Sequence, residues 1–260
     1  MKLFIQRVFW LTCIVVVIAI GIRSFHTVSN TPPIEQIQEN IISPTSNNHA
    51  SLTVRYKDKN YAYEYFTVSD RTKLTLIPNF TQKKTFTEIL TSNHCTAGIN
   101  GSYYDTNDMP LGGFISGGKA LKQPITSRLM DGYISVADVR MDIGLSPLPN
   151  SSILLQTGPL LFLNNTPLTL RISSDEPARR SISVKTKNDS IYFFIIYDPD
   201  SVYLGPYLAD LPQIVDIIHT DMSLSIVSAI NLDGGNASAF KNSTITLNEL
   251  THVGSIFCVQ

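Results

Sequence analysis

Alternating hydrophobic and polar positions begin near residue 51 and predict a series of strands. The first three alternating segments are residues 51–56, 61–68 and 72–77, and polar turns separate them. Further short apolar segments typical of strands lie at residues 97–99, 113–115, 133–136, 153–156, 181–185, 191–197, 224–232 and 253–259. The pattern therefore predicts a β-rich domain.

Two segments have the spacing of helices. Residues 85–90 carry apolar positions on one side and end near Asn93. A longer helix is predicted from residue 206 or 207 to residue 219, where Pro206 and Pro212 indicate that the first turn is separate. Because strands come in runs and helices are few, the pattern favours the α+β class over a regular βαβ array.

The amino terminus has a different composition from the rest of the chain. Lys2 and Arg7 precede an apolar run over residues 8–22, which ends at Arg23. No pair of suitably spaced small residues follows as a signal peptidase would require, so residues 1–23 are predicted to be an uncleaved signal anchor. The positive-inside rule then places the rest of the chain outside the cytoplasm, in the periplasm or the extracellular space.

Residues 24–50 are rich in Ser, Asn, Thr, Pro, Gln and Ile and have no steady period. Such a segment is typical of a tether. We therefore expect a membrane anchor in residues 1–23, a flexible tether in residues 24–50 and a single domain over residues 51–260.

Charge and cysteine content narrow the function classes. A formal net charge of −1, without a long basic run interleaved with aromatic residues, argues against nucleic acid as a partner. Cys95 and Cys258 lie in the exported part, where they either form a disulfide or are two separately buried thiols. The histidines show no metal-ligand spacing, and no Gly-x-Ser-x-Gly motif indicates an ordinary esterase.

The stretch from Ile230 to Ser238 is the most informative candidate for chemistry. An apolar run stops at Asp233 and passes into Gly234 and Gly235. Paired glycines let the backbone approach a ligand closely, and their N–H groups can bind an anion. The same residues also match the Asp-Gly turn of a hairpin, so both interpretations stand at this point.

Three other clusters at the ends of apolar runs are each typical of ordinary turns. Taken in order, however, the four clusters resemble the phosphodiester glycosidase family over roughly residues 95–259. The motifs that carry the resemblance are Ile99-Asn100-Gly101-Ser102-Tyr103-Tyr104 with Pro110-Leu111-Gly112, Thr157-Gly158-Pro159-Leu160, Arg180-Ser181-Ile182 and Asn231-Leu232-Asp233-Gly234-Gly235. The chain departs from the family at Asn236, where a third glycine is usual, and at Ser102 and Tyr103, where Gly and Phe are usual.

The resemblance implies hydrolysis of the bond between a sugar's anomeric carbon and phosphate, on a glycan or sugar-phosphate substrate. It implies Asp233 as nucleophile or base, with Asp105 as second choice and Asp198 as a distant third. Arg180 would bind two phosphate oxygens with its planar guanidinium. Asn100 would either bind sugar hydroxyls or fix the loop. The other residues implied in substrate binding are Gly101, Tyr104, Gly158, Asn231, Gly234 and Gly235.

Two alternatives remain open from the residues. Asp105 can form a turn or bind a hard cation such as Ca²⁺ or Mg²⁺ together with backbone carbonyls, so a divalent cation is left open as cofactor although no metal-ligand set is assigned. Loss of the third glycine at Asn236 motivates the alternative that the domain is a non-catalytic carbohydrate- or envelope-binding module.

Overall fold

The computed structural model describes residues 51–260. The predicted anchor and tether, residues 1–23 and 24–50, lie outside the described residues. Among the helices of residues 51–260, none has the length and apolar character needed to cross a membrane.

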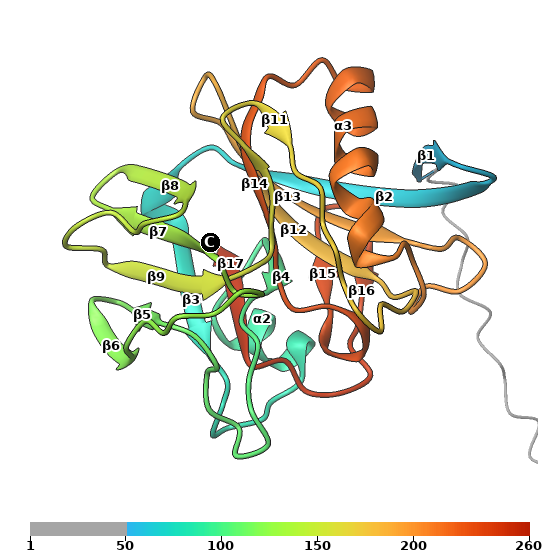
Figure 1. Ribbon diagram of the computed structural model, residues 1–260. Helices are drawn as coiled ribbons and strands as arrows, with labels where there is room; N and C mark the ends of the chain where they lie inside the picture. The colour runs from blue at the N-terminus through green and yellow to red at the C-terminus, as the bar shows by residue number, and fades with distance from the viewer. Residues whose placement is uncertain (1–50) are drawn as a thin grey trace, which may run out of the picture. The chain divides into compact units, whose positions relative to one another are not determined.

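The strands of the described part form three antiparallel sheets (Figure 1). The seven-stranded sheet has the order β1 (Leu52–Tyr56), β2 (Lys59–Val68), β13 (Ile191–Tyr197), β12 (Arg180–Thr186), β14 (Ile226–Asn231), β10 (Leu160–Leu163) and β11 (Thr166–Pro167). A second sheet has the order β16 (Thr246–Leu247), β15 (Phe240–Lys241), β4 (Ala97–Asn100), β17 (Ser255–Val259) and β3 (Leu74–Pro78). The third has the order β6 (Lys119–Lys122), β5 (Phe114–Ser116), β9 (Ile153–Thr157), β7 (Gly132–Ala137) and β8 (Arg140–Gly144).

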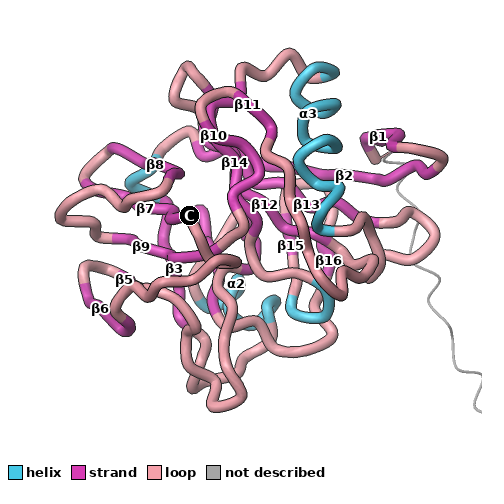
Figure 2. The backbone as a smooth tube through the Cα atoms, viewed as in Figure 1, coloured by secondary structure: helices cyan, strands magenta, loops and turns pink. Residues whose placement is uncertain are grey.

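Helical segments are few in the described part, as Figure 2 shows. They are α2 (Phe86–Ser92), α3 (Leu211–Asp221) and the short 3₁₀ turns η1 (Arg71–Lys73), η2 (Leu208–Asp210) and η3 (Gly235–Ala237). This β-rich mixed architecture is the one that the sequence pattern predicts.

Local sequence signals explain where the two helices begin. At α2, the Thr85 side chain accepts a hydrogen bond from the Glu88 backbone, and the Glu88 carboxylate accepts one from the Thr85 backbone. This reciprocal pair satisfies two of the free N–H groups at the helix start. At α3, η2 forms the separate first turn that Pro212 predicts, because proline is accommodated in the first turn of a helix but not further in.

Two apolar cores lie on the two faces of the seven-stranded sheet. On β13, Phe194 and Ile196 belong to the core that includes α3, whereas Phe193 and Ile195 belong to the core shared with the other two sheets. Alternate side chains of a strand point to opposite faces, so a sheet covered on both sides needs a continuous apolar run. The run of residues 191–197 meets that requirement.

The chain changes sheets immediately after β14. This strand pairs with β12 and β10 in the seven-stranded sheet, whereas the next strand, β15, pairs with β4 and β16 in the second sheet. Asp233, Gly234 and Gly235 therefore lie in a connection between two sheets. The hairpin interpretation of these residues is wrong.

Cys95 and Cys258 form a disulfide between the segment that precedes β4 and the strand β17. The bridge closes a loop with a sequence separation of 163 residues. Closing a loop of this size restricts the unfolded chain, so the double variant Cys95→Ser/Cys258→Ser is expected to lose about 2–5 kcal/mol of unfolding free energy. Urea unfolding of the variant and the parent checks this, and equal midpoints would contradict it.

Candidate active site

A shallow depression of about 410 Å³ lies where β4 and β14 end. Three chain segments form it: the residues after β4, the residues after β14 and the approach to β17. Its lining consists of Tyr103, Tyr104, Asp105, Thr106, Asp233, Gly234, Asn236, Ala237 and Thr251. Asp233 and Asp105, the first and second choices for the catalytic carboxylate, thus line the same depression.

Asp233 is held by three hydrogen bonds of its own backbone and carboxylate. Its N–H donates to the Gly101 carbonyl at 3.0 Å, and its carbonyl accepts from Asn100 Nδ2 at 2.6 Å. The Gly234 N–H donates to Asp233 Oδ1 at 2.9 Å. Burial raises the pKa of Asp233 to about 7, although the hydrogen bond from Gly234 acts in the opposite direction. A carboxyl group with this pKa exchanges protons readily at neutral pH, as acid–base catalysis requires.

Asn100 is buried, and both polar atoms of its side chain form hydrogen bonds within the protein. Besides the bond to Asp233, Asn100 Oδ1 accepts from Ser181 Oγ at 2.6 Å and from the Ala239 N–H at 3.0 Å. The amide therefore joins β4, β12 and the segment that leads into β15. In this conformation it fixes the Asp233 loop, which is one of the two roles that the resemblance implies.

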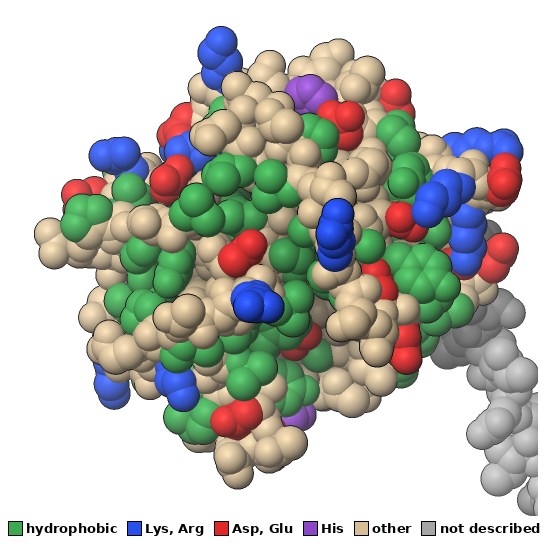
Figure 3. Space-filling model, viewed as in Figure 1, with side chains coloured by type: hydrophobic (Ala, Val, Ile, Leu, Met, Phe, Trp, Pro, Cys, Tyr) green, Lys and Arg blue, Asp and Glu red, His purple; other side chains and the backbone are tan. Residues whose placement is uncertain are grey.

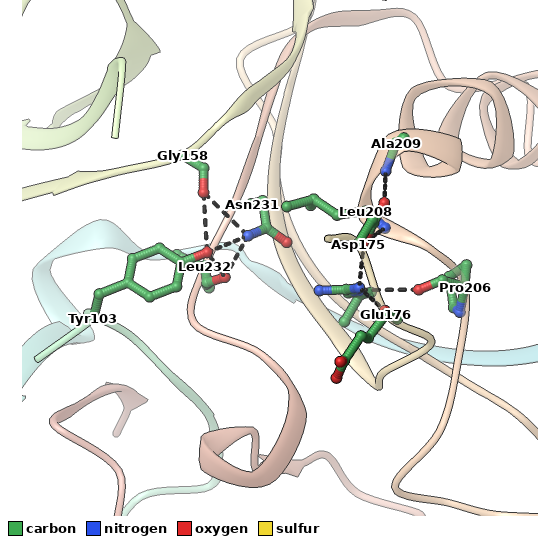
Figure 4. A network of polar contacts seen from close by, with 10 residues as sticks. Tyr103, Gly158, Asp175, Glu176, Pro206, Leu208, Ala209, Asn231 and Leu232 are labelled. Atoms are coloured by element: carbon green, nitrogen blue, oxygen red, sulfur yellow. Dashed lines mark hydrogen bonds and ion pairs between the residues drawn. The ribbon is translucent and has the colours of Figure 1, made fainter. Parts of the chain in front are cut away.

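A second polar network holds the end of β14 (Figure 4). Asn231 Nδ2 donates to the Tyr103 hydroxyl and to the Leu232 carbonyl, each at 2.6 Å, and lies 3.1 Å from the Gly158 carbonyl. The Tyr103 hydroxyl is 3.1 Å from both carbonyls and can donate to either. One arrangement supplies each of the three acceptors with one of the three protons. The Asn231 Oδ1 atom is buried and has no hydrogen-bond partner among the described residues.

Gly158 can occupy its position because it lacks a side chain. Its φ is +154°, and an added Cβ would lie 2.3 Å from the Leu129 carbonyl oxygen. Without that clash, the Gly158 carbonyl reaches the Tyr103 hydroxyl and the Asn231 amide. Gly158 therefore acts through the backbone that it presents to the site.

The two adjacent arginines have different environments. Arg179 is buried, donating from Nε to Ser238 Oγ at 2.7 Å and from Nη2 to the carbonyls of Ser238 and Asn248. Burial lowers the pKa of its guanidinium to about 10. The Arg179 side chain thus anchors the segment that contains Ser238 and Asn248, whereas the side chain of Arg180 lies beside Gly234.

Arg180 binds the protein through one edge of its guanidinium. Its Nε donates to the Pro206 carbonyl at 3.0 Å, and its Nη2 donates to the Glu176 carbonyl at 2.6 Å and to Asp175 Oδ1 at 3.3 Å. Among the described residues, no hydrogen bond involves Nη1, which lies 3.8 Å from the place of a Cβ on Gly234. This conformation leaves Nη1 for a ligand, and the two-pronged grip on phosphate stays a prediction.

Asp175 connects Arg180 to the start of α3. In addition to its ion pair with Arg180, its two carboxylate oxygens accept from the N–H groups of Leu208 and Ala209, at 3.0 and 2.8 Å (Figure 4). Burial lowers the pKa of Arg180, and the charge of Asp175 raises it. The carboxylate thus holds the guanidinium in place and also satisfies free N–H groups of η2.

The glycine loop does not offer the amides that the sequence predicts for phosphate binding. The Gly234 N–H is donated to Asp233, and the Gly235 N–H is donated to the Arg179 carbonyl at 2.9 Å. Gly235 has φ +61°, a conformation that favours glycine. The two glycines therefore shape the loop around Asp233, and their N–H groups are occupied in this conformation.

Asp105 adopts the turn geometry that was one of its open interpretations. Its Oδ1 accepts from the N–H groups of Asn107 and Met109, at 2.8 and 3.0 Å. Across residues 51–260, no three His, Cys, Asp or Glu side chains gather as a metal site would require. Asp198 pairs with Lys59 at 2.8 Å and is not among the residues that line the depression.

Several residues of this region escaped sequence reasoning. Tyr103 carries a visible signal, because it replaces a usual phenylalanine of the resembled family, but its hydroxyl was not assigned a role. Asn236 was noted as a lost glycine and in the structure lines the depression. Thr251 and Asp175 lie outside the motifs, although Asp175 precedes Arg180 by only 5 residues, and no local pattern links either of them to Asp233.

Comparison with known proteins supplies the family and the fold. The family model described as phosphodiester glycosidase matches residues 93–259. None of the curated proteins matches. The catalytic domain of zebrafish N-acetylglucosamine-1-phosphodiester alpha-N-acetylglucosaminidase, in a structure auto-inhibited by its pro-peptide, has 14% sequence identity and a TM-score of 0.64, with 81% of each chain covered. A hypothetical protein from Synechocystis also has 14% identity, with a TM-score of 0.62 and coverage of 80% of this chain and 61% of that one.

Proposed function

Because this chain belongs to the phosphodiester glycosidase family, we propose that it hydrolyses a sugar-1-phosphodiester at the bond between the anomeric carbon and the phosphate oxygen. The products are the free sugar and a phosphate monoester of the second alcohol. We propose further that the domain acts outside the cytoplasm on a membrane anchor, with the apolar run of residues 8–22 as support.

One observation carries the proposal. A carboxyl group whose pKa burial raises to about 7 and a guanidinium with a free Nη1 lie beside the same glycine, Gly234. A sugar-1-phosphodiester has one centre that needs a carboxylate, the anomeric carbon, and one that needs a cation, the phosphate. Asp233 and Arg180 provide these two groups from the ends of β14 and β12.

The proposed hydrolysis requires little help for the departure of the leaving group. The carbon–oxygen bond breaks with its electron pair going to the phosphate, and the phosphate monoester that leaves is weakly basic, so a strong general acid is not required. Ionised Asp233 either attacks the anomeric carbon or takes a proton from the attacking water. Arg180 Nη1 stabilises the negative charge of the departing phosphate.

The pH dependence of hydrolysis follows from Asp233, which must be ionised in either role. We expect kcat/KM to rise with pH through a midpoint near 7, the pKa of Asp233, and to level off above it. The experiment offers the full chain a panel of sugar-1-phosphodiesters and measures released sugar between pH 5 and 9. An activity that falls across this range would contradict the assignment of Asp233 as nucleophile or base.

A second candidate function rests on Asn236, which lines the depression in place of a usual glycine. A non-catalytic domain that binds sugar phosphates would require the same depression without turnover. Calorimetric binding of a sugar phosphate, combined with no sugar release over the whole substrate panel with and without Ca²⁺ or Mg²⁺, would favour this candidate.

A further inference from the structure

Large exposed apolar side chains belong mostly to segments whose backbone is bonded to the lining of the depression. They form a set that we call the apolar rim: Met109 (43% exposed), Leu111 (39%), Leu129 (45%) and Leu250 (55%). Single exposed leucines are ordinary on a protein surface, but several around one depression indicate a binding surface. In Figure 3, hydrophobic side chains lie in several groups among charged ones on the face that is shown.

The backbone ties the apolar rim to the depression. Three of its members are hydrogen-bonded through main-chain atoms to residues that line the depression. The carbonyl oxygen of the fourth, Leu129, lies 2.3 Å from the place of a Cβ on Gly158. The bonds are Asp105 N–H to the Met109 carbonyl at 2.9 Å, Leu111 N–H to the Tyr103 carbonyl at 3.1 Å and Leu250 N–H to the Asn236 carbonyl at 2.8 Å. The position of the apolar rim is therefore set by the same hydrogen bonds that shape the depression.

The chemical nature of these four side chains limits which ligands can pack against them. Met and Leu have no hydroxyl, amide or ring to bind sugar hydroxyls or stack on a nucleobase, and the lining of the depression contains no Lys or Arg for a second phosphate. Hydrocarbon is the chemistry that they match, because burial of apolar surface is favourable without directional contacts. A second sugar or a nucleotide would gain no directional contact from these four side chains.

We propose that the second alcohol of the phosphodiester is a hydrocarbon chain, of alkyl or isoprenoid type, and that the apolar rim binds it. The proposal rests on the proposed function, since it names the part of the substrate that lies beyond the phosphate. With the sugar at Asp233 and the phosphate at Arg180, the chain extends over the loops that carry Met109, Leu111 and Leu250.

The test compares a methyl and an octyl diester of the same sugar 1-phosphate, used with the full chain below the micelle-forming concentration of the octyl compound. Each buried methylene lowers KM about fourfold, so an octyl chain that buries two to three methylenes is expected to lower KM by about 10- to 100-fold at unchanged kcat. Binding of octyl phosphate against methyl phosphate, measured by calorimetry, gives the same comparison without turnover. Octyl phosphate is expected to bind tighter by a similar factor.

Matched variants test whether the apolar rim causes the difference in KM between the octyl and methyl diesters. Leu111→Ser and Leu250→Ser are expected to raise KM for the octyl diester about tenfold and to leave KM for the methyl diester unchanged. Val139→Ser and Leu145→Ser are the controls, because these side chains are also exposed but lie next to β8, with no bond to the lining residues. Thermal melting of each variant verifies that it is folded.

The outcomes separate this proposal from the proposed function. Turnover of both diesters with equal KM would overturn the hydrocarbon proposal and leave the glycosidase. Tighter binding of octyl phosphate without turnover of either diester would support the apolar rim and overturn the proposed function. Binding to phosphatidylcholine vesicles that Leu111→Ser abolishes, with no preference for octyl phosphate, would overturn the proposal in favour of a membrane-docking surface.

Discussion

Replacing Asp233 by asparagine is expected to remove turnover and at the same time to stabilise the folded protein above pH 7. Asparagine is nearly the same size as aspartate and keeps an oxygen that can accept the hydrogen bond from the Gly234 N–H. It cannot take a proton from water or attack the anomeric carbon. Loss of a positioned base typically lowers kcat by about 10²- to 10⁴-fold. The amide therefore removes the chemistry while it keeps the local structure.

The stability gain follows from the raised pKa of Asp233. Between its ordinary value of 3.8 and about 7, the folded protein keeps a proton that the unfolded chain has lost. Because the folded state binds more protons, the free energy of unfolding decreases as pH rises through this window and stays low above it. Asp233→Asn has no such loss, so at pH 8 it is expected to be more stable than the parent by about 1–3 kcal/mol, a figure that allows for partial contact with water.

Urea unfolding of the parent and of Asp233→Asn at pH 4 and pH 8 measures the difference, together with sugar release at pH 8. The two proteins are expected to have similar stability at pH 4 and to diverge at pH 8. Asp58→Asn, which removes an exposed carboxylate next to β1, controls for the loss of a negative charge. A variant that retains full turnover would eliminate Asp233 as nucleophile or base, and a variant less stable than the parent at pH 8 would contradict its burial.

Truncation of Asn100 is expected to have the largest effect on stability of the substitutions considered. Asn100→Ala leaves three buried groups without the bonds that Asn100 makes to them: the Asp233 carbonyl, the Ser181 hydroxyl and the Ala239 N–H. An unsatisfied buried polar group costs about 1–3 kcal/mol, so the total loss of unfolding free energy is expected to be about 3–5 kcal/mol. The Asp233 loop also loses a tether, and a displacement of about 1 Å can lower activity roughly 100-fold.

Two measurements separate these effects. Urea unfolding gives the stability loss, and sugar release at low temperature, where the variant is folded, gives the loss of activity. Asn107→Ala is the matched control, because this asparagine is exposed on the neighbouring loop and is expected to change neither quantity. Wild-type stability for Asn100→Ala would show that water replaces the amide, and would remove Asn100 as the residue that fixes the loop.

Much of the secondary structure could be predicted from local patterns, because burial of a repeating face leaves its period in the sequence. The apolar run of β13 and the spacing of α3 are clear examples, and the capping signals at Thr85 place the start of α2. The pattern missed β6, β8, β10, β15 and β16. The strand β6 has no buried residue, and β15 and β16 have two residues each, so they contribute no measurable period.

The sequence predicted which residues meet at the site better than it predicted what each of them does. Asp233, Asp105, Tyr104 and Gly234 meet in one depression, as the order of the motifs indicated. The amides of Gly234 and Gly235 were assigned to phosphate, yet each has a partner inside the protein. A sequence shows that a glycine loop is able to bind an anion, but it does not show which N–H groups the surrounding chain has already used.

By itself, the sequence determined the β-rich class, the family and the carboxylate that follows β14, because periodicity and motif order are properties of neighbouring residues. Tertiary structure alone decided that β14 and β15 lie in different sheets and that Cys95 reaches Cys258. It also decided that Arg179 is buried, while Arg180 Nη1 has no hydrogen-bond partner among the described residues. The raised pKa of Asp233 is likewise a property that only the tertiary structure decided. Each of these depends on atoms brought together from distant parts of the chain, and the energies involved, desolvation and hydrogen bonding, act through space.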